Sequence, residues 1–195
     1  MAHPDPGLIR RPFWFLRHGR TDWNSLGICA GQQDRPLDAT GEAQAAAIAP
    51  IIASLGVTKI YHSTLRRAAR TAAIIAGSGR YALVPERDLQ EACLGVREGT
   101  TELDPDEDFI SDWLDGMPID GAETFTELQW RVVAAVNRCL TNADEPPPLL
   151  VAHWAVFHAI AAASGARGYN ISNCEPCRFV PTESGWRIES LSGAG

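Results

Sequence analysis

Arginine and histidine side chains follow three separate short apolar segments of this 195-residue chain. Arg17 and His18 come directly after one apolar run, Arg67 follows a second, and His153 follows a third. Arginine matches phosphate oxygens bidentately and stays charged at any working pH. Histidine near neutral pH is unprotonated at one ring nitrogen and can act as a nucleophile. If the three segments are neighbouring strands, these side chains form an anion site suited to phosphoryl transfer.

The elements that must position these residues alternate between strand and helix. Short apolar runs predict strands at 12–17, 57–62, 81–84 and 149–152. Helical spacing predicts helices at about 40–55, 65–76, 125–140 and 154–164. Segments 178–180 and 186–188 are expected to form an edge strand or a hairpin.

This alternation predicts an α/β fold, a three-layer sandwich with a largely parallel central sheet and helices on both faces. Ligands of such sheets bind at the carboxyl ends of the strands, where residues 17–24, 62–67 and 153–156 lie. We expect a loose N-terminal tail at 1–11 and a single domain over 12–195.

Composition limits the partners and the compartment. The net charge of −7 argues against nucleic acid and against a membrane surface, because both are anionic. The N-terminus does not resemble a secretory signal, and no apolar run is long enough for a transmembrane helix. Five cysteines, an odd and scattered set, predict reduced thiols in a cytoplasmic protein. Cys174 and Cys177 have C-x-x-C spacing, but a single pair is more typical of ordinary thiols than of a redox or zinc site.

One segment carries a family resemblance. The sequence Arg17-His18-Gly19-Arg20-Thr21-Asp22-Trp23-Asn24 resembles the signature R-H-G-x-T-x-x-N of the histidine phosphatase superfamily, the phosphoglycerate-mutase-like proteins. Further blocks similar to those of the family follow in the family's order, at 31–41, 63–71, 89–99, 121–132 and 151–153. The resemblance covers about 13 to 160, most of the chain.

The resemblance implies a set of catalytic roles. His18 is expected to attack phosphorus and become phosphohistidine. Arg17, Arg67 and His153 are expected to hold the phosphoryl oxygens. Glu91 is expected to protonate the leaving oxygen and then, as a carboxylate, to activate the water that cleaves phosphohistidine. Because arginines supply the positive charge, neither a metal nor another cofactor is expected.

The substrate-binding residues are expected among Asn24, Gly31, Gln32 and Trp154. The chain departs from the family pattern at two of its blocks. Trp154 stands where glycine usually follows the second histidine, and its indole either narrows the pocket and offers a stacking face or packs into the core. Residues 28–30 lack the arginine that often precedes the loop glycine.

Three functions remain to be separated at this stage. We favour hydrolysis of an unidentified small phosphorylated metabolite, because phosphoglycerate mutases of the family carry a long basic insertion after the acid block. Here the corresponding stretch, 92–122, is short and rich in Asp and Glu, with Arg97 as its one basic residue. Its acidic part, 102–108, is a solvated loop or, with the apolar residues that follow, a lid over the pocket. The alternatives are mutase-type phosphoryl transfer and a non-catalytic phosphate-binding module; the oligomeric state stays open.

Overall fold

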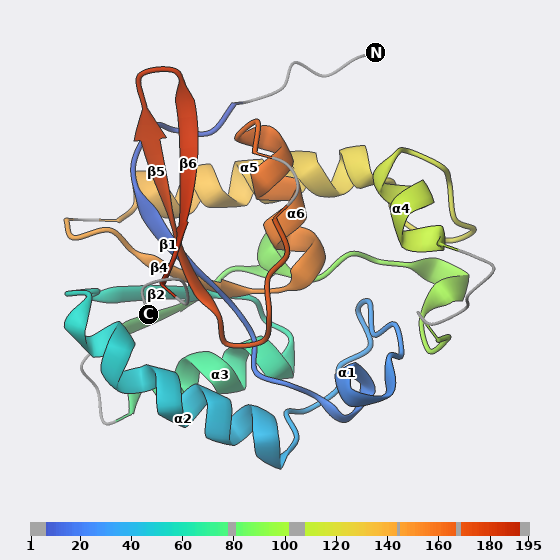
Figure 1. Cartoon of the computed structure of the whole chain (residues 1–195), viewed down its shortest axis with the longest axis horizontal. Coiled ribbons are helices and arrows are strands. Elements are labelled where there is room, and N and C mark those ends of the chain that lie inside the picture. Colours follow the sequence, from blue (N-terminus) through green and yellow to red (C-terminus); the bar gives the residue numbers. More distant parts are fainter. Residues whose placement is uncertain (1–6, 78–80, 102–107, 144, 167–168, 192–195) are drawn as a thin grey trace.

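The computed structural model describes residues 7–77, 81–101, 108–143, 145–166 and 169–191. Its centre is a six-stranded sheet in the order β3-β2-β4-β1-β5-β6 (Figure 1). Strands β3, β2, β4 and β1 are parallel, and the antiparallel hairpin of β5 and β6 extends the sheet beyond β1. The strands are β1 (Phe13–Arg17), β2 (Lys59–His62), β3 (Ala82–Pro85), β4 (Leu149–Ala152), β5 (Pro176–Thr182) and β6 (Gly185–Ser190).

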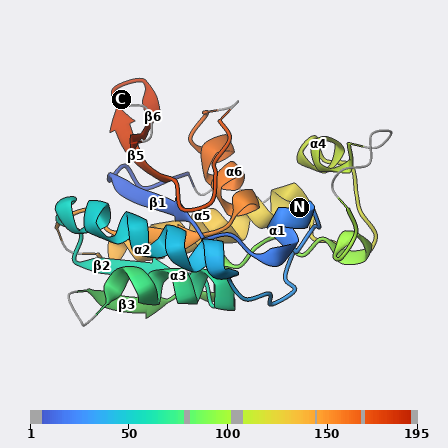
Figure 2. The same cartoon turned by 60° about the horizontal axis from the view of Figure 1, so that its bottom comes forward.

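Two helices cover each face of the parallel part of the sheet, as Figures 1 and 2 show. Helices α2 (Ala39–Ser54) and α3 (Arg66–Ala76) lie on one face, and α5 (Phe125–Thr141) and α6 (Trp154–Ala163) lie on the other. The chain also forms short helices α1 (Asp22–Leu26) and α4 (Phe109–Leu114) and the 3₁₀ turns η1 (Arg87–Leu89) and η2 (Gly95–Arg97). The expected three-layer α/β sandwich is therefore confirmed.

Strand periodicity explains why the sheet is buried on both faces. In β1, Phe13 and Phe15 pack into the core beneath α5 and α6. The intervening Trp14 and Leu16 pack into the core beneath α2 and α3. Since successive side chains of a strand point to opposite faces, a continuous apolar run suits a strand that helices cover on both sides.

Two short helices were not expected from the sequence. In α1, Thr21 is the N-cap, and its hydroxyl and the Asn24 side chain form a reciprocal capping box. Helix α4 lies within the segment expected to be a loop or lid, and its Phe109 and Trp113 are buried. Both helices are too short for hydrophobic periodicity to identify. The acidic stretch 102–107 lies outside the described residues.

Residues 7–11, expected to belong to a loose tail, lie against α5. The Leu8 side chain is buried. The backbone N–H of Ile9 donates to Asn137 Oδ1 at 2.8 Å, and Arg11 Nη1 donates to the Leu140 carbonyl at 2.6 Å. Apolar burial and these hydrogen bonds hold this part of the segment on the domain.

A close backbone approach accounts for one glycine of the signature. A Cβ atom on Gly19 would lie 2.5 Å from the carbonyl oxygen of Gly41, and a Cβ on Gly41 would lie 2.0 Å from that of Arg20. Both distances are far below van der Waals contact. Glycine is therefore required on both sides where the turn after β1 meets the start of α2.

Candidate active site

A cavity of about 280 Å³ opens at the carboxyl end of β1, next to the start of α3 and of α6. One part of its wall is charged and polar, and another part is apolar and aromatic. It is lined by Arg17, His18, Asn24, Cys29, Ala30, Gly31, Arg67, Glu91, Leu94, Ile110, Trp113, Trp154, Ala155 and Asn170. The parallel strands thus bring residues from distant parts of the sequence to one edge of the sheet.

His18 is fixed in position and in tautomer. Its backbone N–H donates to the Ala152 carbonyl, and its own carbonyl accepts from Asn173 Nδ2, both at 2.9 Å. Its Nδ1 lies 2.7 Å from the Gly19 carbonyl oxygen, which can only accept, so Nδ1 carries the proton. Burial, assisted by Arg67 and Arg17, holds the pKa of His18 well below its usual value. The ring is therefore neutral near pH 7, with its lone pair on Nε2.

The two arginines of the cavity are anchored by backbone carbonyls. Arg67 Nη1 donates to the Gln33 carbonyl at 2.8 Å, and Nη2 donates to the Gly31 carbonyl at 2.7 Å. Arg17 Nη1 donates to the Ile171 carbonyl at 2.9 Å. These contacts hold both guanidinium groups in fixed orientations beside His18, where they concentrate positive charge in an acidic protein.

His153 contacts Arg67 and is not among the described residues that line the cavity. It is fully buried, and its ring centroid is 5.1 Å from that of His18. Its Nδ1 accepts from Arg67 Nε at 3.2 Å, so the proton of the neutral ring is on Nε2, which lies 2.7 Å from Ser63 Oγ. Burial and the nearby Arg67 hold the pKa of His153 well below its usual value. Both ring nitrogens are thus engaged by protein groups.

Glu91 is a buried residue of another segment, and its carboxyl group lies against the N-terminus of α6. Its carboxylate accepts from the N–H of Ala92 at 3.0 Å and from the N–H of Ala155 at 3.1 Å. Burial raises the pKa of Glu91, and the opposing effects of Arg67 and the two amide donors are smaller. A carboxyl group with a raised pKa in a cavity that also holds a neutral histidine is suited to acid–base work.

The outer wall of the cavity includes Trp154, one of its largest apolar groups. Trp154 Nε1 donates to Asn170 Oδ1 at 3.2 Å, and the ring packs on that of His158 with centroids 4.0 Å apart. The indole is half-buried: it lines the cavity and also packs against the core beneath α5 and α6. Ile110 and Trp113 of α4 lie on the same wall.

Two of the three remaining predicted substrate residues line the cavity. Asn24 and Gly31 do so, although Asn24 also caps α1. Gln32 is not among the lining residues that the structure describes. Its Nε2 donates to the Glu91 carbonyl at 3.1 Å, so it contacts the backbone of the acidic residue instead.

The comparison with known families is decisive. A family model of the histidine phosphatase superfamily (branch 1) matches residues 13–193. The chain belongs to this superfamily. A curated relative, the probable phosphoglycerate mutase GpmB of Proteus mirabilis, is 34% identical over 185 residues, which cover 89% of this chain and 86% of the relative. Its counterpart from Salmonella paratyphi B is 34% identical over 186 residues, with the same coverage.

Solved structures of the superfamily have the same architecture. A mycobacterial glucosyl-3-phosphoglycerate phosphatase solved with VO3 is 26% identical, with a TM-score of 0.81 over 91% of this chain and 97% of that chain. The structure described as mycobacterial hydrolase 1 is 27% identical, with a TM-score of 0.80 over 92% of this chain and 96% of that chain. Both a mutase-like relative and a phosphatase neighbour thus resemble this superfamily member.

Other residues considered from the sequence lie apart from the cavity. Arg66, the first residue of α3, is exposed. Cys174 and Cys177 are buried free thiols whose pKa burial raises. In the described part of the chain, no three His, Cys, Asp or Glu side chains come together as a metal site would require. Nor is any helix there long and apolar enough to cross a membrane.

Ser63 and Glu98 support the site from outside the cavity wall, and neither was assigned a role from the sequence. Ser63 contacts His153, and Glu98 Oε1 accepts from the N–H groups of Gln32 and Leu94 at 3.0 and 3.1 Å. Glu98 thereby ties the Gly31 loop to the segment after Glu91. Both residues lie in blocks that resemble the superfamily's, but their contacts are between distant segments and have no local signal.

Proposed function

We propose that the protein hydrolyses phosphate monoesters through a phosphohistidine intermediate on His18. The contacts of His18 carry this proposal: its Nδ1–H donates to the Gly19 carbonyl, which leaves the Nε2 lone pair beside two arginines and a buried carboxyl group. Nucleophile, positive charge and proton donor are the groups that phosphoryl transfer needs.

In the first step, His18 Nε2 attacks phosphorus while the bond from phosphorus to the ester oxygen breaks. Protonated Glu91 gives its proton to the leaving oxygen, so the alcohol departs neutral. Arg17 and Arg67 stabilise the charge on the transferring group, the role that a metal has in other phosphatases. The assignment of His153 to the phosphoryl oxygens stays a prediction, since its ring nitrogens contact Arg67 and Ser63.

In the second step, the Glu91 carboxylate removes a proton from water, whose oxygen attacks phosphorus. The N–P bond breaks, giving inorganic phosphate, neutral His18 and protonated Glu91. The raised pKa of Glu91 supports this alternation, because such a group exchanges its proton more readily near neutral pH than an ordinary carboxyl group.

The direct test is trapping of the intermediate. A phosphate ester labelled with ³²P is mixed with the protein and quenched in alkali, because phosphohistidine is labile in acid. We expect labelled protein from the wild type and none from His18→Ala, which should also lose turnover. Near-normal activity of His18→Ala would refute the mechanism.

Extensive chelation should leave the rate unchanged, and a rate that returns only with a divalent cation would contradict the role given to the arginines.

Phosphoglycerate-mutase-type transfer is the second candidate, because relatives such as the Proteus protein are described as probable phosphoglycerate mutases. The short acidic stretch between Glu91 and Glu123 favours hydrolysis, since it would repel a bisphosphorylated sugar acid. Exchange of phosphate between two phosphoglycerate isomers separates the two activities.

The substrate is proposed to be a small phosphorylated metabolite, acted on in the cytoplasm. The cytoplasmic assignment rests on five cysteines that are all free. A panel of phosphate esters that includes phosphoglycerates and glucosyl-3-phosphoglycerate tests the substrate class, because those compounds appear in the descriptions of the similar proteins.

A further inference from the structure

The segment that carries Glu91 has little regular structure of its own. We call residues 88–93 the acid-bearing segment; only its first two residues belong to a 3₁₀ turn, η1. Glu91 must nevertheless lie within hydrogen-bond distance of the leaving oxygen if it is the acid of the proposed mechanism. Some other part of the molecule therefore has to hold this backbone in place.

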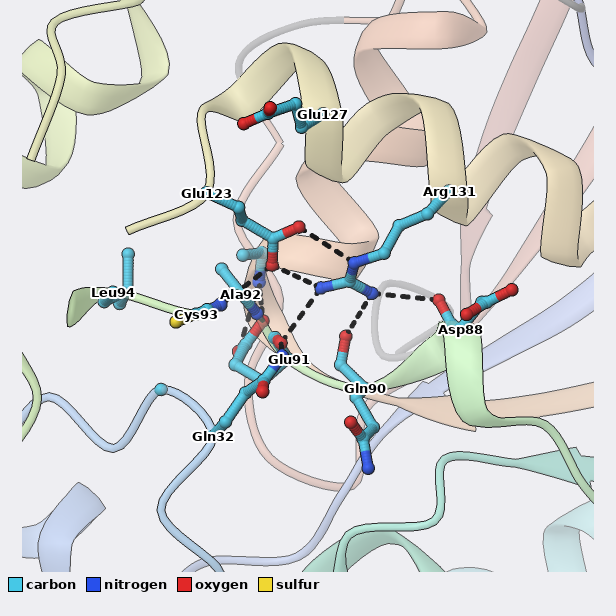
Figure 3. Close-up of polar contacts among 12 residues, drawn as sticks. Gln32, Asp88, Gln90, Glu91, Ala92, Cys93, Leu94, Glu123, Glu127 and Arg131 are labelled. Atoms are coloured by element: carbon cyan, nitrogen blue, oxygen red, sulfur yellow. Dashed lines mark hydrogen bonds and ion pairs between the residues drawn. The ribbon is translucent and has the colours of Figure 1, made fainter. Parts of the chain in front are cut away.

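Arg131 of α5 contacts this segment with most of its hydrogen-bonding capacity (Figure 3). Its Nη1 donates to the carbonyls of Asp88 and Gln90 at 3.0 and 2.8 Å. Its Nη2 donates to the carbonyl of Glu91 itself at 3.0 Å. Three carbonyls of four consecutive residues thus converge on one guanidinium group, which has a rigid planar set of donors.

Glu123 holds Arg131 and the far end of the segment together. Its carboxylate accepts from Arg131 Nε at 2.9 Å and from Nη2 at 2.5 Å. The same carboxylate accepts from the backbone N–H of Cys93 at 2.8 Å, while the N–H of Glu123 donates to the Cys93 carbonyl at 3.0 Å. All five N–H donors of Arg131 are then in use, and Glu91 lies between two anchored points of its backbone.

Neither residue of this ion pair lines the cavity in the part of the chain that the structure describes. The pair is only partly exposed, with relative side-chain accessibilities of 22% for Arg131 and 16% for Glu123. Its contacts with the acid are to backbone atoms. The ion pair therefore supports the backbone of the acidic residue and does not contact the substrate.

We propose that Arg131, oriented by Glu123, is the positioning residue that sets the carboxyl group of Glu91 against the leaving oxygen. This inference rests on the proposed function of Glu91. It gives a role to Arg131 and Glu123, which the sequence analysis placed in the block 121–132 without a function. A displacement of about 1 Å at a catalytic group can cost about 100-fold in rate, which is the scale of effect we expect.

Two esters distinguish positioning of an acid from a general structural role. The leaving group of para-nitrophenyl phosphate is a stable anion that departs without a proton, whereas the alkoxide of glycerol phosphate must be protonated. The rate of phosphoenzyme formation is measured with each ester in a rapid-quench apparatus with alkaline quench. This step precedes the water attack, so the second role of Glu91 does not enter.

For Arg131→Met we expect phosphoenzyme formation to fall by about 100-fold with glycerol phosphate and by no more than about threefold with the nitrophenyl ester. Arg131→Lys should behave similarly, because an ammonium group has too few donors and no planar fork. Glu91→Gln should reproduce the same selective loss. Glu123→Gln conserves the size of the side chain and should shift the ratio in the same direction if Arg131→Met fails to fold.

Arg138→Met is the matched control. Arg138 lies on the same helix and contacts the side chains of Glu86 and Asp88, at 2.9 and 2.6 Å, but no backbone carbonyl of the segment. It should leave both rates unchanged. Equal losses with both esters in Arg131→Met and Glu123→Gln, or no loss at all, would overturn the positioning role. Labelling of His18→Ala would instead refute the proposed function itself.

Discussion

Ser63→Ala tests the hydrogen-bond network behind the cavity. Ser63 is fully buried, and its Oγ accepts from two buried donors, His153 Nε2 at 2.7 Å and the Leu65 backbone N–H at 3.2 Å. Alanine fills nearly the same space but leaves both donors without this acceptor. A buried donor that loses its partner costs about 1–3 kcal/mol, so about 1.5 kcal/mol for each gives about 3 kcal/mol in all. For a domain of this size, the Tm should fall by about 6–12 °C.

The assay is urea unfolding followed by tryptophan fluorescence, with the slope against urea expected to be unchanged. Ser164→Ala is the control, because the Ser164 hydroxyl donates to the Ala161 carbonyl, which also accepts from the Ala166 N–H at 2.9 Å. No buried group is orphaned there, so the loss should stay below about 1 kcal/mol. Equal losses in the two variants would refute the role given to Ser63 as the partner of these two buried groups.

Three further outcomes follow from the site. Trp154→Gly should change the order of preference in a panel of phosphate esters, with bulky esters gaining most. The free energy of unfolding should fall by less than the loss of about 3–5 kcal/mol that is typical of deleting a buried tryptophan. An unaltered order of preference would show that Trp154 does not determine specificity. Because burial raises the pKa of Glu91, kcat/KM for an alkyl ester should fall as pH rises through that raised value, and Glu91→Gln should lack this limb; a limb that persists in the variant would assign it elsewhere. His18, His153 and His158 have lowered pKa values in the folded state, the last of about 4, so the unfolded chain binds more protons below about pH 6.5. Stability measured by urea titration should therefore decrease as pH falls from 6.5 to 5, with a slope that approaches about 1.4 kcal/mol per pH unit for each histidine and that the raised pKa of Glu91 partly offsets; a flat profile would contradict their neutral state.

Much of the fold could be predicted because the relevant patterns are local. The apolar runs that became β1 and β4 alternate between two cores, and the helical spacing in 125–140 corresponds to the buried face of α5. Parallel strands end at the same edge of a sheet, so residues following them, such as His18 and Arg67, were expected to meet. Short helices such as α4 and the packing of Leu8 have no comparable periodic signal.

The signature around His18 predicts which residues would carry the chemistry, since those side chains lie within a few positions of strand ends and their types define what they can do. Only the tertiary structure decided how these groups are held: the tautomer of His18, the contact of His153 with Arg67, and the reach of Arg131 to three carbonyls some 40 residues away in sequence. Such contacts depend on where a side chain from one element ends relative to the backbone of another. The distance between that side chain and that backbone is set by the packing of whole helices and strands, and no local sequence pattern encodes it.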